Sequence, residues 1–296
     1  MKVPDLSAYE NLIGGFTGGI ASTLVCHPFD LLKIRFSANE GNPLRPQYNG
    51  YADAVRKIVR AEGIRGLYQG LTPSLIGASL SWGLYFQWYY VIKETIQKYT
   101  PSGNENVDNL ICGFLSGSAV MCITNPIWLT KTRLCLQYEN RKAKQFDGMI
   151  DCMKQTVKQD GFNGLYRGFV PGIIGTTHGA IQFAIYNWMK DKRCEMRGIP
   201  KDSFLNHTDY LFFSASSKIL ATTMTFPYQV LRTRMQDHNA MNRGIWNTTM
   251  RTIHNEGIAG LWKGCIIANI RQLPAAIVTF ITYENVKRFV GMTKQS

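Results

Sequence analysis

Three short motifs recur in the same order three times along this chain of 296 residues. The first is a proline motif, the second an acidic residue followed by glycine, and the third an aromatic residue four positions before a lysine. The three copies of each are His27–Lys33, Asn125–Lys131 and Phe226–Arg232; Glu62–Gly70, Asp160–Gly168 and Glu256–Gly264; and Tyr89–Lys93, Tyr186–Lys190 and Tyr283–Lys287. Repetition at a nearly constant period indicates one supersecondary unit in three copies, which constrains the fold more than the length does.

Two long apolar segments flank the motifs in each copy, with a short amphipathic stretch between them. The six apolar segments are expected at residues 12–35, 71–92, 110–134, 169–190, 209–234 and 265–288. Each is long enough to cross a ~30 Å hydrocarbon core, which takes about 20 helical residues. None is uniformly apolar, as is typical of helices that line a water-filled cavity with one face. The sequence therefore predicts an all-α membrane protein with six transmembrane helices in three pseudo-threefold repeats.

The repeat boundaries follow from the motif spacing. Repeat 1 is expected to cover residues 1–104, repeat 2 residues 105–203 and repeat 3 residues 204–296, within one integral membrane domain. Hydrophobic residues make up 45% of the chain and charged residues 18%, with a net charge of +13, a balance that suits contact with anionic lipid. The chain has no Lys/Arg run and no zinc-finger or RNA-recognition motif, so no nucleic-acid partner is expected. The seven cysteines form no CxxC pair, and no metal site is expected.

Together these signatures resemble the mitochondrial carrier family over nearly the whole chain. The resemblance implies a threefold pseudo-symmetric bundle with short helices on the matrix side and one substrate site that opens alternately to each side. It also implies a multi-pass protein of the mitochondrial inner membrane. We expect a monomer without a prosthetic group, in contact with the lipid bilayer and with cardiolipin on the matrix side.

Further stretches are similar to the folate/FAD carrier branch of that family, namely Gln69–Pro73, Leu80–Phe86, Thr177–Phe183 and Tyr228–Val230. The stretch Pro126–Trp128 is shared with relatives that carry pyrimidine nucleotides and NAD. The resemblance therefore favours FAD as the transported solute, with folate as the main alternative. A carrier of NAD or pyrimidine nucleotides, or a carrier-fold protein that transports nothing, is a further alternative.

Charged positions of the proline motifs are expected to form a gate on the matrix side, because charge pairs between helices can break without dismantling a fold. The expected gate residues are Asp30, Lys33, Trp128, Lys131, Gln229 and Arg232. Only Asp30 is acidic, so one ion pair is expected there, between Asp30 and Lys131. Gln229 can accept a hydrogen bond from a cation, and Trp128 can offer its ring face to one.

The aromatic-lysine elements are expected to form a second gate, on the cytosolic side. Its residues are Tyr90, Lys93, Asn187, Lys190, Glu284 and Lys287, and of these only Glu284 is acidic. Two weak gates predict either a low barrier on each side or closure that depends on packing. The alternative for every one of these charges is a solvated residue at a membrane end.

Lys218 and Arg271 lie well inside predicted membrane segments, where an ionisable side chain costs about 2.5–3.5 kcal/mol. Both are expected to bind the anionic groups of a solute, and an arginine can do so bidentately. The alternatives are a lysine that extends to the interface and an arginine paired within the protein. By resemblance, the mid-cavity contacts map to Gly77, Ala78, Ile174, Gly175, Arg271 and Gln272.

Small residues on two of the three helices, Gly77 and Ala78 on one and Gly175 on the other, are expected to leave room for a bulky ring. Trp82, Tyr85 and His178, about one turn closer to the cytosol, are expected to stack on that ring, although helix packing or lipid contact is the alternative for the aromatic pair. An enzyme is not expected, because the chain has no HExxH, GxSxG or GxGxxG motif. A proton channel would call for carboxylates inside the membrane, where Asp30 is nearly alone.

Overall fold

A computed structural model describes residues 10–40, 45–99, 105–137, 145–200, 205–238 and 244–292, without the side chains of 10–13, 105, 106, 287 and 290–292. The described residues form helices and turns, with no strand among them. Each third of the chain contains a long helix, a short helix, a 3-10 turn and a second long stretch of helix. The chain is thus all-helical and built from a threefold repeat, as the motifs predict.

The long helices are α1 (Glu10–Ala38), α3 (Leu71–Tyr99), α4 (Glu105–Cys135), α6 (Phe169–Arg197) and α7 (His207–Gln236). The last long stretch consists of the short α9 (Cys265–Ile270) followed by α10 (Gln272–Met292). The short elements are α2 (Tyr51–Glu62), α5 (Met149–Asp160) and α8 (Ile245–Glu256), each followed by a 3-10 turn: η2 (Ile64–Tyr68), η3 (Phe162–Tyr166) and η4 (Ile258–Trp262). The helices α3 and α6 extend well beyond the predicted ends at residues 92 and 190.

The last predicted segment, 265–288, is assigned as two helices, α9 and α10, with Arg271 between them. Backbone hydrogen bonds continue through this point, from Arg271 N to the Ile267 carbonyl at 3.0 Å and from Ala275 N to the Arg271 carbonyl at 3.1 Å, so the stretch is continuous. Pro274 lies one turn later and has no N–H to donate to the carbonyl of Ile270, which accounts for the local irregularity.

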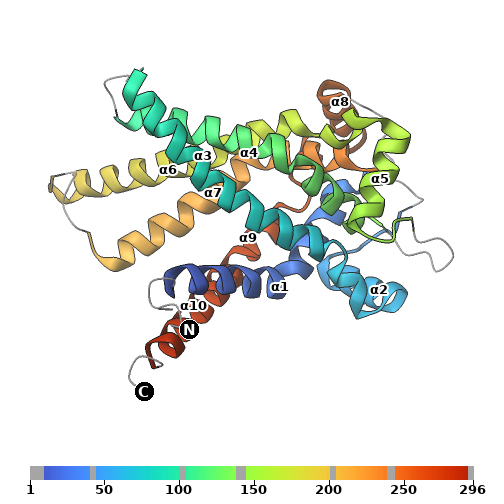
Figure 1. The fold of residues 1–296 in the computed structure, drawn as a ribbon, viewed down its shortest axis with the longest axis horizontal. Coiled ribbons are helices and arrows are strands. Elements are labelled where there is room, and N and C mark those ends of the chain that lie inside the picture. Colours follow the sequence, from blue (N-terminus) through green and yellow to red (C-terminus); the bar gives the residue numbers. More distant parts are fainter. Residues whose placement is uncertain are drawn as a thin grey trace, which may run out of the picture.

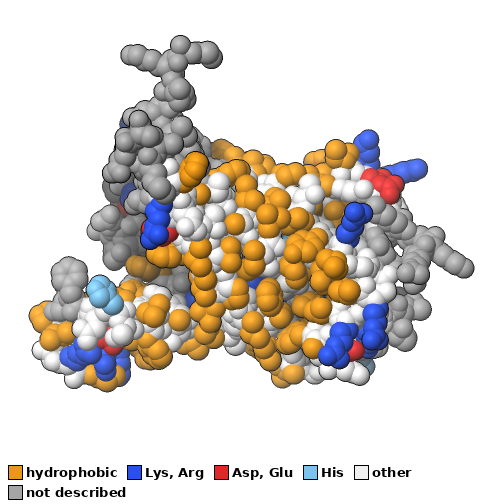
Figure 2. Space-filling view, turned by 90° about the horizontal axis from the view of Figure 1, so that it is seen from below, with side chains coloured by type: hydrophobic (Ala, Val, Ile, Leu, Met, Phe, Trp, Pro, Cys, Tyr) orange, Lys and Arg blue, Asp and Glu red, His pale blue; other side chains and the backbone are white. Residues whose placement is uncertain are grey.

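The long helices pack as three pairs, α3 with α4, α6 with α7 and α1 with α10. Figure 1 shows the three pairs diverging toward one end of the molecule, while α2, α5 and α8 lie at the other end. On the face seen in Figure 2, hydrophobic side chains cover the middle and charged side chains gather at the two ends. Two described stretches, Val107–Cys135 and Ile258–Val286, are long and apolar enough by themselves to cross a membrane.

A repeated buried ion pair joins each proline-containing helix to the short helix that follows it. Arg35 contacts Glu62 at 2.6 Å, Arg133 contacts Asp160 at 3.3 Å, and Arg234 contacts Glu256 at 2.7 Å. The three arginine side chains are almost completely buried. Since a buried charge is stable only when it is paired, these contacts fix the end of the bundle that carries the short helices.

The final glycine of each acidic-glycine block allows close contact between repeats. Gly70, Gly168 and Gly264 have φ values of 77°, 74° and 91°, in a region that favours glycine. A β-carbon at these positions would lie 3.0–3.1 Å from the carbonyl oxygen of Lys131, Arg232 and Lys33, respectively. Each block therefore packs directly against the backbone of a matrix-gate cation.

Candidate substrate site and gates

A cavity of about 600 Å³ lies between α1, α6, α7, α9 and α10. Its lining includes four of the predicted solute contacts and two of the predicted gate residues: His178, Lys218, Arg271, Gln272, Lys33 and Gln229. Thr222, Tyr283 and small side chains of α10 complete the polar and apolar walls. The structure therefore brings together residues from all three repeats.

Hydrogen bonds fix two of the neutral side chains in this cavity. The Gln272 amide Nε2 donates to Thr222 Oγ1 at 3.0 Å and to Asn269 Oδ1 at 3.1 Å. The Thr225 hydroxyl donates to the Ala221 carbonyl at 2.6 Å and lies 3.0 Å from His178 Nδ1. Because the hydroxyl hydrogen is used, the contact with His178 is satisfied when Nδ1 donates to Thr225 Oγ1.

Arg271 is paired with the carboxylate of the matrix gate. Its Nε lies 2.8 Å from Asp30 Oδ1, although the N–H direction does not make this contact an aligned hydrogen bond. Lys131 Nζ lies 3.4 Å from the other oxygen, Asp30 Oδ2, so the ion pair expected within the gate is present. Asp30 is therefore shared between a gate lysine and an arginine that was expected to be free for the solute.

The other gate contacts are weaker than ion pairs. Lys33 Nζ donates to Gln229 Oε1 at 2.6 Å, and Lys131 Nζ lies 5.3 Å from the ring centroid of Trp128 on its own helix. The expected roles of Gln229 as an acceptor and of Trp128 as a ring partner thus correspond to contacts in the structure. Arg232 contacts no carboxylate among the described residues, and its Nη2 donates to Met121 Sδ at 3.4 Å.

The predicted small-residue contacts do not line the 600 Å³ cavity. A β-carbon at Gly77 would lie 3.2 Å from Ile127, and one at Gly175 would lie 2.6 Å from Tyr228. These glycines allow close packing between helices, and Gly175 also lines a neighbouring cavity of about 380 Å³, so their expected contact with the solute stays a prediction. Ala78 and Ile174 also lie outside the cavity lining, and Ile174 is half exposed.

The predicted aromatic contacts on α3 lie apart from the cavity as well. Tyr85 stacks on Tyr89 at 6.0 Å, and Tyr89 donates to Asn109 Oδ1 of α4 at 3.1 Å, so this pair packs between helices. Trp82 is exposed and stacks on Phe86 with a centroid distance of 5.9 Å. Trp82 and Phe86 precede Tyr90 at helical spacing, which places them on the α3 face of the cytosolic gate.

The residues of the predicted cytosolic gate are not joined to one another in the described part of the structure. Tyr90 is exposed, and no ion pair joins Lys93, Lys190 and Glu284 among the described side chains, which do not include Lys287. Asn187 is partly exposed in the same region. The predicted matrix-gate residues thus contact one another, whereas the described residues of the predicted cytosolic gate do not.

Sequence reasoning missed the arginines of the three buried ion pairs, Arg35, Arg133 and Arg234. Each stands two residues after a gate cation, so the repeat itself contained the signal. A threefold helical bundle with a charged cavity that is closed at one end defines a solute transporter rather than an enzyme.

The chain belongs to the mitochondrial carrier family. The family described as mitochondrial carrier protein matches residues 4–100, 102–196 and 203–294, one match in each repeat. The chain is therefore a multi-pass transport protein of the mitochondrial inner membrane, and its sequence lies near the folate/FAD branch of the family.

Three relatives illustrate that position. The chain is 35% identical to Folate transporter 1, chloroplastic, of Arabidopsis thaliana, over 95% of this chain and 96% of the relative. It is 30% identical to Mitochondrial FAD carrier protein FLX1 of Saccharomyces cerevisiae, over 94% and 96%. It is 31% identical to Nicotinamide adenine dinucleotide transporter 2, mitochondrial, of Arabidopsis thaliana, over 93% and 78%.

Proposed function

We propose that this carrier transports FAD across the mitochondrial inner membrane by alternating access. The bundle would span the membrane six times, with α9 and α10 together forming the sixth span, in the three repeats 1–104, 105–203 and 204–296. One observation carries the proposal: among the described residues, five cations and one carboxylate lie around the gate and the cavity. The cations are Lys33, Lys131, Lys218, Arg232 and Arg271, and the carboxylate is Asp30.

This surplus of positive charge favours a solute with at least two negative charges. Opposite charges attract strongly in a partly dehydrated cavity, and an unpaired cation there is costly. FAD brings a pyrophosphate with two charges, and folate brings two carboxylates. The positive nicotinamide ring of oxidised NAD cancels one of its two charges, which makes NAD the poorer match.

The Asp30 contacts suggest how solute binding would open the matrix gate. A pyrophosphate bound to Arg271 would compete with Asp30, and Asp30 also contacts Lys131. When the contact between Arg271 and Asp30 weakens, the Asp30 carboxylate can also move away from Lys131. A ligand can shift a conformational equilibrium only by binding one state better, and this exchange of partners provides such a difference.

Folate is the second candidate, favoured by the 35% identity to a folate transporter. A folate glutamate would also present its carboxylates to Arg271 and Lys218. The planar pterin differs from a flavin mainly in size and in its hydrogen-bonding edge. Uptake measurements must therefore compare the two solutes directly.

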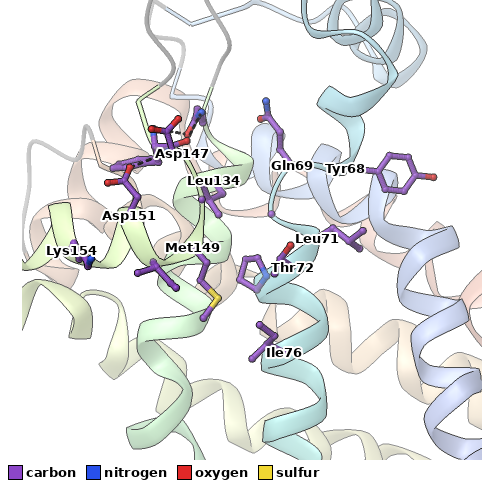
Figure 3. A pocket seen from close by; sticks show the side chains of 16 residues that line it. Tyr68, Gln69, Leu71, Thr72, Ile76, Leu134, Asp147, Met149, Asp151 and Lys154 are labelled. Atoms are coloured by element: carbon purple, nitrogen blue, oxygen red, sulfur yellow. Dashed lines mark hydrogen bonds between the residues drawn. The ribbon is translucent and has the colours of Figure 1, made fainter.

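A second cavity, of about 810 Å³, is a candidate site for cardiolipin on the matrix side. Figure 3 shows Leu71 and Thr72 at the start of α3, and Met149 and Lys154 on α5, around this cavity. Free backbone N–H groups at two helix starts and the Lys154 ammonium suit a phosphate head group. Asp151 Oδ2 accepts from Asp147 N at 2.9 Å and from Gln155 Nε2 at 2.8 Å, which reduces its repulsion of an anion.

Uptake into liposomes tests the proposed function. Purified protein should give saturable uptake of radiolabelled FAD that cold FAD inhibits and NAD does not. Saturable uptake of folate alone would change the solute and keep the mechanism. Absence of saturable uptake for both solutes would contradict the proposal and favour a carrier-fold protein that transports nothing. Because one bundle contains the whole cavity, we also expect a monomer by light scattering in detergent.

A further inference from the structure

The matrix gate has three corners, where α1, α4 and α7 meet in pairs, and two of them are bridged. Lys131 of α4 contacts Asp30 of α1, and Lys33 of α1 donates to Gln229 of α7. At the third corner, between α4 and α7, the motif positions hold Trp128 and Arg232. Neither a hydrogen bond nor an ion pair joins those two side chains in the described part of the chain.

Arg232 lacks an adequate acceptor at this corner. Its Nη2 donates to the Met121 thioether, a weak acceptor, at 3.4 Å. Its Nε is buried and has no hydrogen-bond partner among the described residues. A guanidinium has five N–H donors, and removing it from water without an anion is costly. The corner therefore requires a counter-ion that the described residues do not supply.

A cavity of about 380 Å³ opens at this corner. Arg232, Lys131 and Lys33 line it, and its described lining contains no Asp or Glu. Tyr228, held against Gly175 by a 3.4 Å hydrogen bond to the Gly175 carbonyl, forms part of the wall. The lining is thus positively charged and has an aromatic side.

This cavity adjoins the 600 Å³ cavity. Lys33 and Gln229 line both of them and form the wall between the two. A solute held by Arg271 in the larger cavity can therefore extend past this wall toward Arg232. The two arginines offer separate bidentate contacts to one extended anion.

We propose that the 380 Å³ cavity is a second anion subsite, in which the Arg232 guanidinium binds a phosphate or carboxylate oxyanion of the transported solute. The subsite rests on the proposed function, since it adds a contact to the same solute. The bound oxyanion would also complete the third corner of the gate, because it supplies the counter-ion that the motif positions lack. A solute without a reachable oxyanion binds only the larger cavity.

Substitution of Arg232 is the first test. KM for uptake into liposomes is measured with FAD and with folate for Arg232→Gln, Arg232→Lys and Lys158→Gln. Lys158 is exposed on α5, outside both cavities, and controls for the loss of one positive charge. For the solute that the wild-type protein takes up, Arg232→Gln should raise KM at least tenfold. Arg232→Lys keeps the charge but not the bidentate geometry, so it should raise KM less than Arg232→Gln does, and Lys158→Gln should leave KM unchanged.

A pair of substitutions at Gly172 tests the subsite without removing Arg232. A β-carbon there would lie 3.5 Å from Arg232 Cζ and 3.3 Å from the flexible Met121 Sδ. Gly172→Asp would give Arg232 an internal carboxylate that competes with the solute, and Gly172→Asn adds nearly the same volume without charge. We expect KM to rise about tenfold more in Gly172→Asp than in Gly172→Asn.

The outcomes separate the subsite from the proposed function. The subsite is overturned if wild-type uptake is saturable and is lost in Arg271→Gln while the KM of Arg232→Gln stays within twofold of wild type. The proposed function then still stands. Equal KM values for Gly172→Asp and Gly172→Asn also overturn the subsite, whether or not the Arg232 variants fold. Equal losses in Arg232→Gln and Arg232→Lys would reveal a structural role instead. Absence of saturable wild-type uptake overturns both proposals.

Discussion

Arg271 Nε lies 2.8 Å from Asp30 Oδ1, so the arginine between α9 and α10 contacts the carboxylate of the first proline motif. The same carboxylate contacts Lys131 of the second repeat. One acidic side chain thus joins all three repeats of the carrier. This residue links the proposed solute site to the predicted matrix gate, so a change in one should alter the other.

Removal of the Asp30 charge should strengthen solute binding and weaken the resting gate. In Asp30→Asn, Arg271 loses its internal competitor, so we expect the KM for FAD uptake to fall about three- to tenfold. The unfolding free energy without solute should fall by about 1–3 kcal/mol, because the mostly buried Lys131 and the partly exposed Arg271 both lose a partner. Thermal unfolding with and without FAD measures both effects. If both KM and the unfolding free energy were unchanged, the Asp30 contacts would contribute neither to solute binding nor to stability.

A carboxylate at Gln229 should strengthen the matrix gate. The Gln229 amide oxygen already accepts from Lys33 Nζ at 2.6 Å, so Gln229→Glu converts this hydrogen bond into an ion pair with little change of shape. We expect a higher melting temperature and a lower maximal uptake rate, because the closed gate is harder to open. Gln159→Glu, at an exposed position of α5, is the matched control for the added charge. Equal effects of the two substitutions on the uptake rate would contradict the prediction.

The repeated motifs predict much of this architecture but not its long-range contacts. Motif spacing gives the order of the helices and the Asp30–Lys131 pair, because equivalent positions in three repeats face a common axis. The Arg271–Asp30 contact joins residues from opposite ends of the chain and has no repeated equivalent. No local sequence pattern therefore predicts the Arg271–Asp30 contact.

The sequence leaves the packing at the small and aromatic positions open for a related reason. Gly77 and Gly175 could equally leave space or admit a neighbour, and in the structure side chains of adjacent helices contact both positions. Tyr85 likewise packs toward α4 through Tyr89. Which face of a helix is packed depends on the pairing of helices, and this pairing is a property of the assembled bundle. The irregularity at Arg271, in contrast, had a local signal in Pro274.

The glycine that ends each acidic-glycine block should resist substitution. In Gly264→Ala, the new β-carbon would meet the Lys33 carbonyl oxygen at 3.0 Å, at a residue whose φ is 91°. We expect a loss of about 1–3 kcal/mol in unfolding free energy, from backbone strain and a displaced gate helix. Gly244→Ala is the matched control, since nothing lies within 4 Å of its β-carbon position and its φ is −121°. Similar melting temperatures for the two variants would contradict this assignment.

The buried arginine pairs should contribute far more to stability than exposed ion pairs on the same helices. Glu62→Gln leaves Arg35, which is fully buried, without its charged partner, and we expect a loss of about 3–5 kcal/mol. Lys57→Gln breaks the exposed pair with Asp53 on α2, which should cost at most about 1 kcal/mol. Denaturant unfolding in one detergent measures both variants under the same conditions. Equal stability of Glu62→Gln and Lys57→Gln would contradict this prediction. The hydrogen bonds from Arg35 to the Cys135 and Gln137 carbonyls would then suffice to hold the guanidinium, and the repeated ion pair would be dispensable.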